Sequence, residues 1–417
     1  MSGAYRGAQA FILRSNSLAV YSPCGCHSLN LCGVHAAECC PQVITFFGVV
    51  QKLYNLFSSS PQRWEILQAA VGHSLHSLSA TRWSARVEAV RALATHLPGI
   101  VKALEQVKQL NLTAEAQHDV VTILKYLRSF DCILMANIWL KVLTAIDIRN
   151  KVLQAREATL DVEVENIRSL IDDMKELRGS WVHILGESKQ VAENSGLEPA
   201  LAAEKRRRNK KKFPDGAERQ PPHDVPGQDM TAPEMTFKIE VFYTLMDCLL
   251  ANMSTRFEAA NQLSSIFGFL WNYSSLDANA LQEQAKEFSC KYGKDVSPNI
   301  AEEVDDLKMI HAANLGSAPL APLALLNKLH TLKLDSIFPN VCVGLRIFCT
   351  LPTTVAQAER SFSVLARVKN FLRSTMGQGR LTSLGMLAIE SDLAREIDFD
   401  SVITVFAAQR ARKTSFV

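Results

Sequence analysis

The feature that most constrains this chain is a helical pattern that fills its middle. Residues 114–192 contain almost no glycine or proline, and apolar residues recur there at intervals of three and four positions. That spacing places apolar side chains on one face of a helix. We therefore expect long helices packed around a buried core over residues 41–191, and more helix over residues 235–288. Residues 160–185 are more charged and have the pattern of a coiled-coil arm.

Two short apolar runs interrupt this pattern near the ends of the chain. Residues 17–21 lie between turn-forming residues, and residues 343–349 are followed closely by Pro352. Short apolar runs with such boundaries predict buried β-strands. One strand cannot satisfy its own edges, so the first run needs strands from elsewhere in the chain. Helices are predicted on either side of it, over residues 5–13 and from about Ser28.

Composition narrows the class of protein. The 417 residues are enough for two or three domains with a large core, and 47% hydrophobic residues with 21% charged residues are ordinary for a globular chain. A net charge of +3 is too small to indicate nucleic-acid binding by itself. Met1–Gly7 does not start a signal peptide, and there is no apolar run of the length that spans a membrane. We expect an intracellular protein without membrane contact whose ten cysteines are reduced.

Residues 204–234 read as a solvated linker, because a dense basic run is followed by a segment rich in proline, glycine, aspartate and glutamine. The run has three interpretations: a nuclear-localisation signal, a set of phosphate contacts, or a loop that tolerates charge. Its position beside a flexible segment favours nuclear import, and we expect the protein in the nucleus. The basic residues are Lys205, Arg206, Arg207, Arg208, Lys210, Lys211 and Lys212.

The tail changes character again. A helix is expected to start near Val355, capped by Thr353 or Thr354, with further helices over residues 378–391 and 399–410. The first helix is expected to turn its apolar residues inward. The second has an apolar surface too broad for one helix on its own core, so a partner surface is predicted. The candidate dimerisation residues are Phe362, Leu365, Leu372, Leu381, Leu384 and Leu387.

Motifs in the tail give a specific resemblance. Residues 351–363 read LPTTVAQAERSFS, residues 368–376 read VKNFLRSTM, and residues 380–384 read RLTSL. Together with residues 335–340, DSIFPN, this series resembles the C-terminal dimerisation region of hAT-family transposases.

Two earlier blocks agree with that family in order and spacing. Residues 24–27, CGCH, look like its C/D-x-x-H block, and residues 81–86, TRWSAR, look like the T-R-W block that opens its helical insertion. The resemblance covers essentially the whole chain. Within the family, the chain resembles the zinc finger MYM-type and TTF-type domain-containing proteins, and by this resemblance we expect that an N-terminal part is missing.

The resemblance implies a fold that is mainly α: an incomplete ribonuclease H-like α/β fold interrupted by a large all-helical insertion. Residues 1–40 are then a partial ribonuclease H-like segment, residues 41–320 the insertion, and residues 321–417 the C-terminal ribonuclease H-like part with the dimerisation region. The expected partners are a second copy or a related hAT-derived protein, with DNA as a further candidate.

The family cuts DNA with three carboxylates that hold two metal ions. Glu359 matches the third acid, but the first two are expected ahead of this sequence, and no Asp or Glu occurs before Glu38. We therefore expect a non-catalytic protein without a cofactor, with Mg²⁺ relevant only if the missing acids were present. Glu359 then reads as a glutamate favoured by a helix N-terminus. The alternative is a fragment of a DNA transposase whose catalytic N-terminal part is missing.

The resemblance also gives DNA-binding candidates, namely Cys24, His27, Arg82 and Trp83. Trp83 has two open interpretations, a ring that stacks on an unpaired base or an aromatic residue of the core. Cys24-x-x-His27 and Cys32-x-x-His35 resemble zinc ligands in spacing, but four residues between the pairs leave too little chain to close a tetrahedral site. No metal is predicted, and Cys39–Cys40 are expected to be buried thiols.

Overall fold

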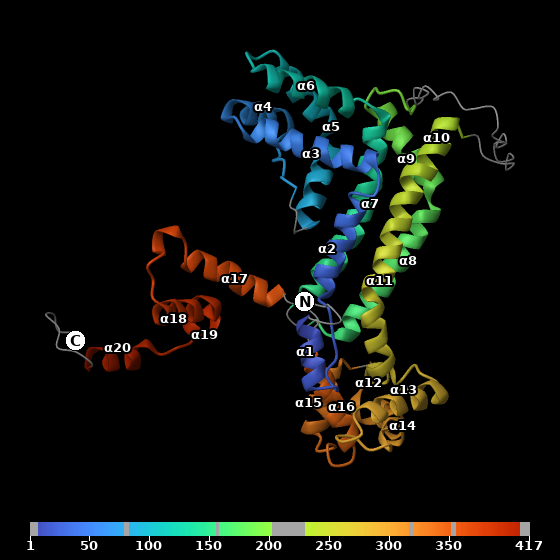
Figure 1. Cartoon of the computed structure of the whole chain (residues 1–417), viewed down its shortest axis with the longest axis vertical. Coiled ribbons are helices and arrows are strands. Elements are labelled where there is room, and N and C mark those ends of the chain that lie inside the picture. Colours follow the sequence, from blue (N-terminus) through green and yellow to red (C-terminus); the bar gives the residue numbers. More distant parts are fainter. Residues whose placement is uncertain are drawn as a thin grey trace. The chain divides into compact units, whose positions relative to one another are not determined.

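The described part of the chain is almost entirely helical (Figure 1). The computed structural model describes residues 7–78, 83–155, 158–201, 230–316, 318, 320–351 and 356–408. It divides into two compact units, residues 1–353 and 354–417. The helices of the first unit are α1 (Ala8–Ser15), α2 (Gly25–Ala36), α3 (Pro41–Ser58), α4 (Pro61–Val71), α5 (Trp83–Lys108), α6 (Ala114–Leu127), α7 (Phe130–Leu153), α8 (Leu160–Gly179), α9 (Trp181–Asn194), α10 (Ala232–Phe237), η1 (Lys238–Tyr243), α11 (Thr244–Phe267), α12 (Phe269–Asn272), α13 (Ala278–Lys291), α14 (Ile300–Ile310), η2 (His311–Leu315), α15 (Pro322–Thr331) and α16 (Pro339–Cys349). Those of the second are α17 (Ala356–Val368), η3 (Phe371–Arg373), α18 (Gln378–Ile389), α19 (Ser391–Arg395) and α20 (Phe399–Ala408).

The mainly helical class predicted from the sequence is confirmed, but both predicted strands are wrong. Residues 17–21 have no regular secondary structure, and residues 343–349 lie within α16. The described residues contain no strand, so the ribonuclease H-like sheet expected from the resemblance is not confirmed. In place of strand pairing, the first run is held by side-chain contacts, and the Tyr292 hydroxyl donates to the Leu18 carbonyl at 3.3 Å.

Helix α16 shows why the strand prediction failed. A short apolar run is ambiguous between a buried strand and a buried helix, and Val341, Leu345 and Phe348 are buried at helical spacing. A distant residue caps the helix: the Glu303 carboxylate accepts from the backbone N–H groups of Asn340 and Val341 at 2.9 and 3.0 Å. A carboxylate satisfies the free donors of a helix N-terminus and is favoured by its dipole. This cap comes from α14, so local sequence does not reveal it.

Other helices begin at signals that the sequence does display. Ser60, Thr113, Ser129 and Asp277 each accept, through the side chain, a backbone N–H bond from the third residue that follows. Such caps satisfy one of the free donors in the first turn. Gly72 ends α4 in the left-handed conformation, with φ of 70°, which favours glycine.

A first hydrophobic cluster fills the unit from α2 to the first half of α11. Trp83 and Trp139 are almost completely buried, and their ring centroids lie 6.0 Å apart. Phe47 packs edge-on against both rings, at 6.4 and 4.7 Å. Gly33 on α2 lets this helix approach α5 closely, because a Cβ at that position would lie 2.4 Å from the Trp83 ring.

A second hydrophobic cluster lies between α11 and α16. Phe267 at the end of α11 contacts Phe288 and Phe348, with centroid distances of 5.4 and 5.9 Å. Helices α8 and α11 pack on each other, and each contributes buried residues to both clusters. Helices α2, α7, α8 and α11 run alongside one another (Figure 1). The two clusters are therefore joined by continuous helices within one unit.

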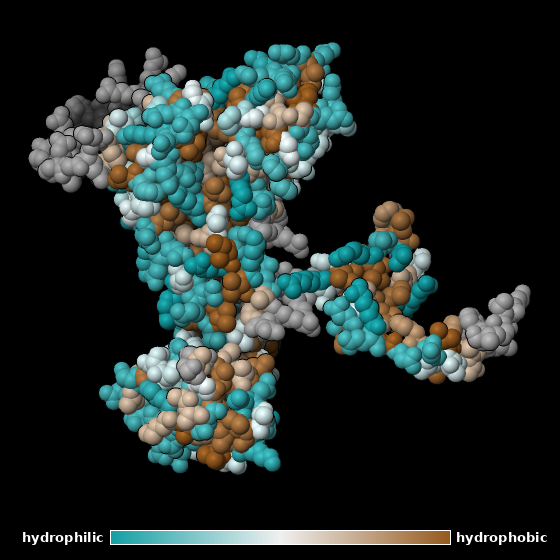
Figure 2. Space-filling model, turned by 180° about the vertical axis from the view of Figure 1, so that it is seen from behind, coloured by the Kyte–Doolittle hydropathy of each residue, from teal (hydrophilic) through white to brown (hydrophobic). Residues whose placement is uncertain are grey.

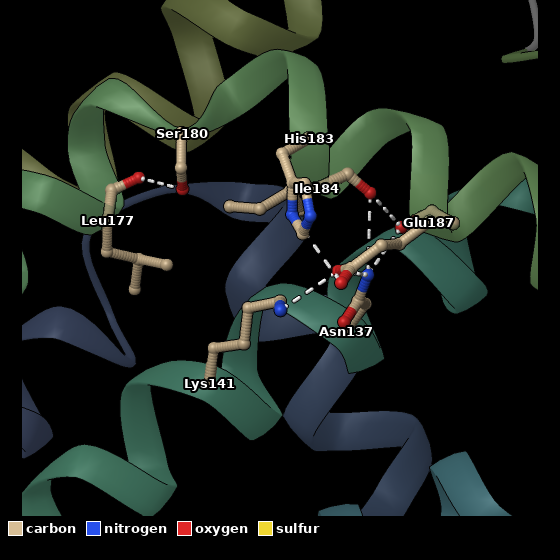
Figure 3. A network of polar contacts seen from close by, with 8 residues as sticks. Asn137, Lys141, Leu177, Ser180, His183, Ile184 and Glu187 are labelled. Carbon is tan, nitrogen blue, oxygen red and sulfur yellow. Dashed lines mark hydrogen bonds and ion pairs between the residues drawn. The ribbon is translucent and has the colours of Figure 1, made fainter.

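A polar network joins α7 to α9 (Figure 3). The Asn137 amide donates to the Ser188 hydroxyl at 2.9 Å, and the Lys141 ammonium lies 2.9 Å from the Glu187 carboxylate. His183 lies 3.5 Å from the same carboxylate. The hydrogen bond from Lys141 holds the pKa of Glu187 below its usual range. Because the ion pairs are partly exposed they add little stability, and their effect is to favour one register between the two helices.

The predicted linker is shorter than residues 204–234. Residues 202–229 lie outside the described residues. Met230 is described, and its sulfur accepts a hydrogen bond from the Trp181 indole N–H at 3.2 Å. Thr231 and Glu234 form a capping box at the start of α10, with the Thr231 N–H donating to the Glu234 carboxylate at 2.9 Å. The segment 230–234 therefore belongs to the helical unit.

Among the residues described, no individual helix combines the length and the hydropathy needed to cross a bilayer. Two sharply bent pairs, α2 with α3 and α6 with α7, reach those values only when each pair is taken together.

The contact between Gly33 and Trp83 can be tested by adding one methyl group. We expect Gly33→Ala to lower the free energy of unfolding by about 1–3 kcal/mol, because the added Cβ overlaps the Trp83 ring. Urea denaturation measures the change. Gly48→Ala, on α3 with nothing within 4 Å of the new methyl, is the control and should be neutral or stabilising. Equal unfolding curves for the two variants would show that Trp83 does not lie against α2.

Candidate functional site

The Cys and His residues with zinc-like spacing do not converge in the structure. Cys24 is the N-cap of α2 and half-buried, and Cys32 on the same helix is fully buried. His27 and His35 are exposed. Burial raises the pKa of Cys32 to about 12, so its thiol behaves as a core group. Across the described ranges no three His, Cys, Asp or Glu side chains gather as metal ligands.

Trp83 lies in the core rather than at a surface. Its side chain is 1% exposed, and the Arg86 guanidinium lies over its ring at 4.7 Å and over Phe47 at 4.9 Å. Burial lowers the pKa of Arg86. Of the two interpretations of Trp83, an aromatic residue of the core agrees with this position. Stacking on a base would require the ring to move out of the hydrophobic core. Arg82 lies outside the described residues.

Sequence reasoning missed a buried acid beside the Cys24–His27 block. Glu163, in the first turn of α8, is 1% exposed, and its Oε1 lies 2.5 Å from where a Cβ on Gly25 would be. Its Oε2 has no hydrogen-bond partner among the described residues. Burial, with a smaller contribution from Cys24, raises the pKa of Glu163 to about 8. Glycine at position 25 makes room for this carboxyl group against the first turn of α2.

The raised pKa gives a pH-dependent stability. The Glu163 carboxyl ionises near pH 4.5 in an ordinary environment and near pH 8 in the fold, so the unfolded chain releases its proton first. The free energy of unfolding is therefore expected to fall as the pH rises from about 4.5 to about 8. We expect Glu163→Gln to remove this dependence and to gain stability relative to the wild type across that interval, by an amount on the order of a few kcal/mol.

Thermal and urea unfolding of the wild type and of Glu163→Gln at several pH values measure that difference. Glu165→Gln, an exposed position two residues along the same helix, controls for the change of residue type. If the profiles of wild type and Glu163→Gln run parallel, the carboxyl group is not held neutral in the fold.

Cys39 and Cys40 differ from each other in burial and in pKa, which the sequence alone did not indicate. Cys40 is buried at the N-cap of α3, directly after Cys39. Interaction with the Cys39 thiol lowers the pKa of Cys40 and raises that of Cys39. Cys40 is buried, as expected from the sequence, and Cys39 is half-buried.

The second unit has almost no core of its own. Among its described side chains Leu381 is the one large hydrophobic residue classed as buried, at 8% exposure. Leu365 and Leu384 are half-buried where α17 approaches α18, and a Cβ on Gly385 would lie 3.2 Å from Leu365. The expectation that the first tail helix turns its apolar residues inward is wrong for Phe362, and also for Leu372 beyond the helix, whose side chains are 70% and 78% exposed. Two short helices packed on each other can cover only one strip of each helix.

The exposed apolar side chains of this unit extend from α17 to α20, and Figure 2 shows brown, hydrophobic residues open at its surface. Isolated exposed apolar residues are ordinary, whereas a series of them within one small unit marks a binding surface. We name the following set the apolar face: Phe362, Phe371, Leu372, Met386, Leu387, Ile389, Leu393, Ile397, Phe399, Val402, Ile403, Val405 and Phe406, each between 37% and 85% exposed.

A comparison with known protein families agrees with this geometry. Residues 311–393 match the family model of the hAT family C-terminal dimerisation region. The match supports an origin in the hAT family and a transposase-related, dimerising protein. It includes most members of the apolar face, together with Leu365, Leu381 and Leu384.

The matched region crosses the boundary between the two units. Its first residue, His311, is buried in the second cluster, with Nδ1 2.7 Å from the Tyr273 hydroxyl and Nε2 3.1 Å from the Ala318 carbonyl. A carbonyl only accepts, so Nε2 carries the proton and Nδ1 accepts from Tyr273. Burial raises the pKa of Tyr273 to about 12, which keeps that hydroxyl a donor.

Two groups of predicted site residues have no described side chain. Glu359 lies near the N-terminal end of α17, with its side chain outside the described residues. The basic residues 205–212 fall in the segment 202–229, which is also outside them. The structure therefore brings together the candidates for dimerisation, and the candidates for DNA contact are divided between the core, the surface and undescribed positions.

Proposed function

We propose that this chain is a transposase-derived, non-catalytic protein that associates with a second copy, or with a related hAT-derived protein, through its C-terminal region. It acts in the nucleus, and any contact with nucleic acid is weak and sensitive to salt. Dimerisation is the molecular function at the centre of the proposal.

The apolar face carries this proposal. Burial of one large aliphatic or aromatic side chain stabilises a fold or an interface by about 1.5–3 kcal/mol, and α20 leaves all of its large apolar side chains outside any core. A ten-residue helix is marginal in water without tertiary contacts. Covering the face with a partner surface of the same composition supplies those contacts, and the family match covers the part of the face up to Leu393.

The absence of catalysis is an expectation that rests on the acids. Two-metal cleavage needs several carboxylates at one point, and Glu359 is the residue in this sequence that matches the family pattern. A fragment of a DNA transposase is the second candidate function, favoured by that same match of Glu359. In that case the remaining acids belong to a segment not contained in the printed sequence.

Dimerisation is tested by placing charge on the apolar face. In the variant Leu387→Asp/Leu393→Asp, two carboxylates replace side chains that are 52% and 62% exposed in a single chain. We expect the dissociation constant to rise at least about 100-fold, since two buried leucines contribute about 3 kcal/mol or more to an interface. Sedimentation velocity at micromolar concentration measures the change.

The matched control is Ile148→Asp/Val182→Asp, which places the same charges on α7 and α9 at 50% and 57% exposure. It should sediment as the wild type does. A wild-type chain that is monomeric at micromolar concentration, or a Leu387→Asp/Leu393→Asp variant that remains dimeric, would contradict the proposal.

Nuclear import is tested at the basic run. Replacement of the seven Lys and Arg residues of 205–212 with alanine should move a tagged chain from the nucleus to the cytoplasm, because an import receptor recognises the clustered charge. Fluorescence microscopy measures the distribution, and sedimentation checks that the variant still dimerises. Fusion of residues 204–213 to a cytoplasmic reporter is the converse test. An unchanged distribution in both experiments would rule the signal out.

A further inference from the structure

The charges of the second unit are sorted along the chain. Residues 360–380, the basic segment, contain Arg360, Arg367, Lys369, Arg373 and Arg380 and no acidic residue. Residues 390–400, the acidic segment, contain Glu390, Asp392, Glu396, Asp398 and Asp400 and a single basic residue, Arg395. Arg380 lies in the first turn of α18, and the uncharged remainder of this helix, residues 381–389, separates the two segments.

Both segments carry part of the apolar face. In the basic segment, Phe371 and Leu372 are 85% and 78% exposed beside Lys369 and Arg373. The acidic segment exposes Leu393, and its apolar residues continue into α20. On α20 the exposed residues Phe399, Val402, Ile403 and Phe406 recur at spacings of three, one and three, which places them on one side of the helix. Each segment is thus an apolar strip edged by charge of one sign.

One copy of the chain leaves these two strips apart. Arg367, Lys369 and Arg373 have no ion-pair partner in the part of the chain that the structure describes. Asp392 pairs with Arg395 within its own segment, at 3.6 Å, and both side chains are highly exposed. No described side chain of α20 is buried. The acidic strip of a copy is therefore open, and so is its basic strip.

Two copies related by a two-fold axis resolve both features at once. In such a pair, if the acidic strip of the first copy contacts the basic strip of the second, then the basic strip of the first copy contacts the acidic strip of the second. Pairing basic with acidic strips places opposite charges around each apolar contact, twice per dimer. Pairing strips of the same kind would place five like charges against five, which disfavours association.

We propose that the dimer is a reciprocal exchange, in which the acidic segment and α20 of one copy pack on the basic segment of the second copy. This inference rests on the proposed function that the chain dimerises. It extends the interface beyond Leu393, where the family match ends, to α20. The partner surface is then defined by charge as well as by apolar area.

Charge reversal with mixing tests the exchange. The first variant is Arg367→Glu/Lys369→Glu/Arg373→Glu, and the second is Glu390→Lys/Asp392→Lys; Asp398 is kept because its carboxylate accepts from the Asp400 N–H at 3.0 Å. Each variant alone should dimerise at least about tenfold more weakly than the wild type, because like charges then meet. An equimolar mixture of the two should recover association, since both contacts of the mixed dimer have opposite charges: one contact is native, and the other pairs the two reversed segments. Sedimentation of separately labelled chains measures both results.

The control is Lys102→Glu/Lys108→Glu/Lys125→Glu, which reverses three exposed charges on α5 and α6 and should dimerise as the wild type does. Removal of residues 399–417 should weaken the dimer, and the wild-type dissociation constant should rise between roughly 50 and 500 mM salt. Circular dichroism monitors folding, and helicity regained on mixing two poorly folded variants also supports the exchange.

The outcomes separate this inference from dimerisation itself. If both charge variants dimerise as tightly as the wild type while Leu387→Asp/Leu393→Asp is monomeric, the exchange is wrong and the chain still dimerises. If both variants are monomeric and mixing restores nothing, the exchange is also wrong. A monomeric wild type, with α20 covered by the first unit or by a different protein, overturns the exchange together with the proposed function.

Discussion

A ten-residue helix is stable in water only when its apolar side is covered, and α20 has five large apolar side chains of which none is buried. Buried apolar side chains are scarce throughout the second unit, where Leu381 is the one large hydrophobic residue among the described side chains that is buried. The conformational entropy lost on ordering this unit is not offset by contacts inside it. A partner surface would supply the contacts that this unit lacks, so association and folding of this region are expected to be linked.

The first unit shows the opposite balance. Its two hydrophobic clusters contain twelve bulky side chains with almost no exposed area, Trp83, Trp139 and Trp181 among them. Helices α8 and α11 contribute buried residues to both clusters, so the two cores are continuous through these helices. The exposed apolar residues of this unit are distributed over many helices. The first unit therefore buries its core without a partner, in contrast to the second unit.

Much of the first unit could be predicted from the sequence, because its helices bury regularly spaced apolar residues. Helix was predicted over residues 235–288, and within it Leu245, Leu249 and Phe257 are buried on α11 at helical spacing. Where the prediction failed, the deciding contact came from far away in the chain, as with Glu303 at the start of α16. The spacing of apolar residues also does not identify the surface that covers them. The exposure of Phe362 was therefore not predicted.

The candidate site illustrates the same limit in chemical terms. The Cys24–His27 block was recognised from its sequence motif. The buried carboxyl group beside it, that of Glu163, comes from more than 130 residues away in the sequence. A glutamate in the first turn of a helix is ordinary by sequence, and only the packing of α8 against α2 makes it a buried, uncharged group. The tail motifs, in contrast, identified the dimerising region correctly because their information is local and the residues are contiguous.

The family match also bears on how the dimer is attached to the rest of the chain. Its first part, from η2 to α16, is buried in the second cluster, where Leu325, Leu329 and Leu345 have no exposed area. Its second part, from α17 to α19, carries most of the apolar face. The matched region is therefore not an independent domain: one end is fixed in the core of the first unit, and the other end is completed by contacts that a single copy lacks.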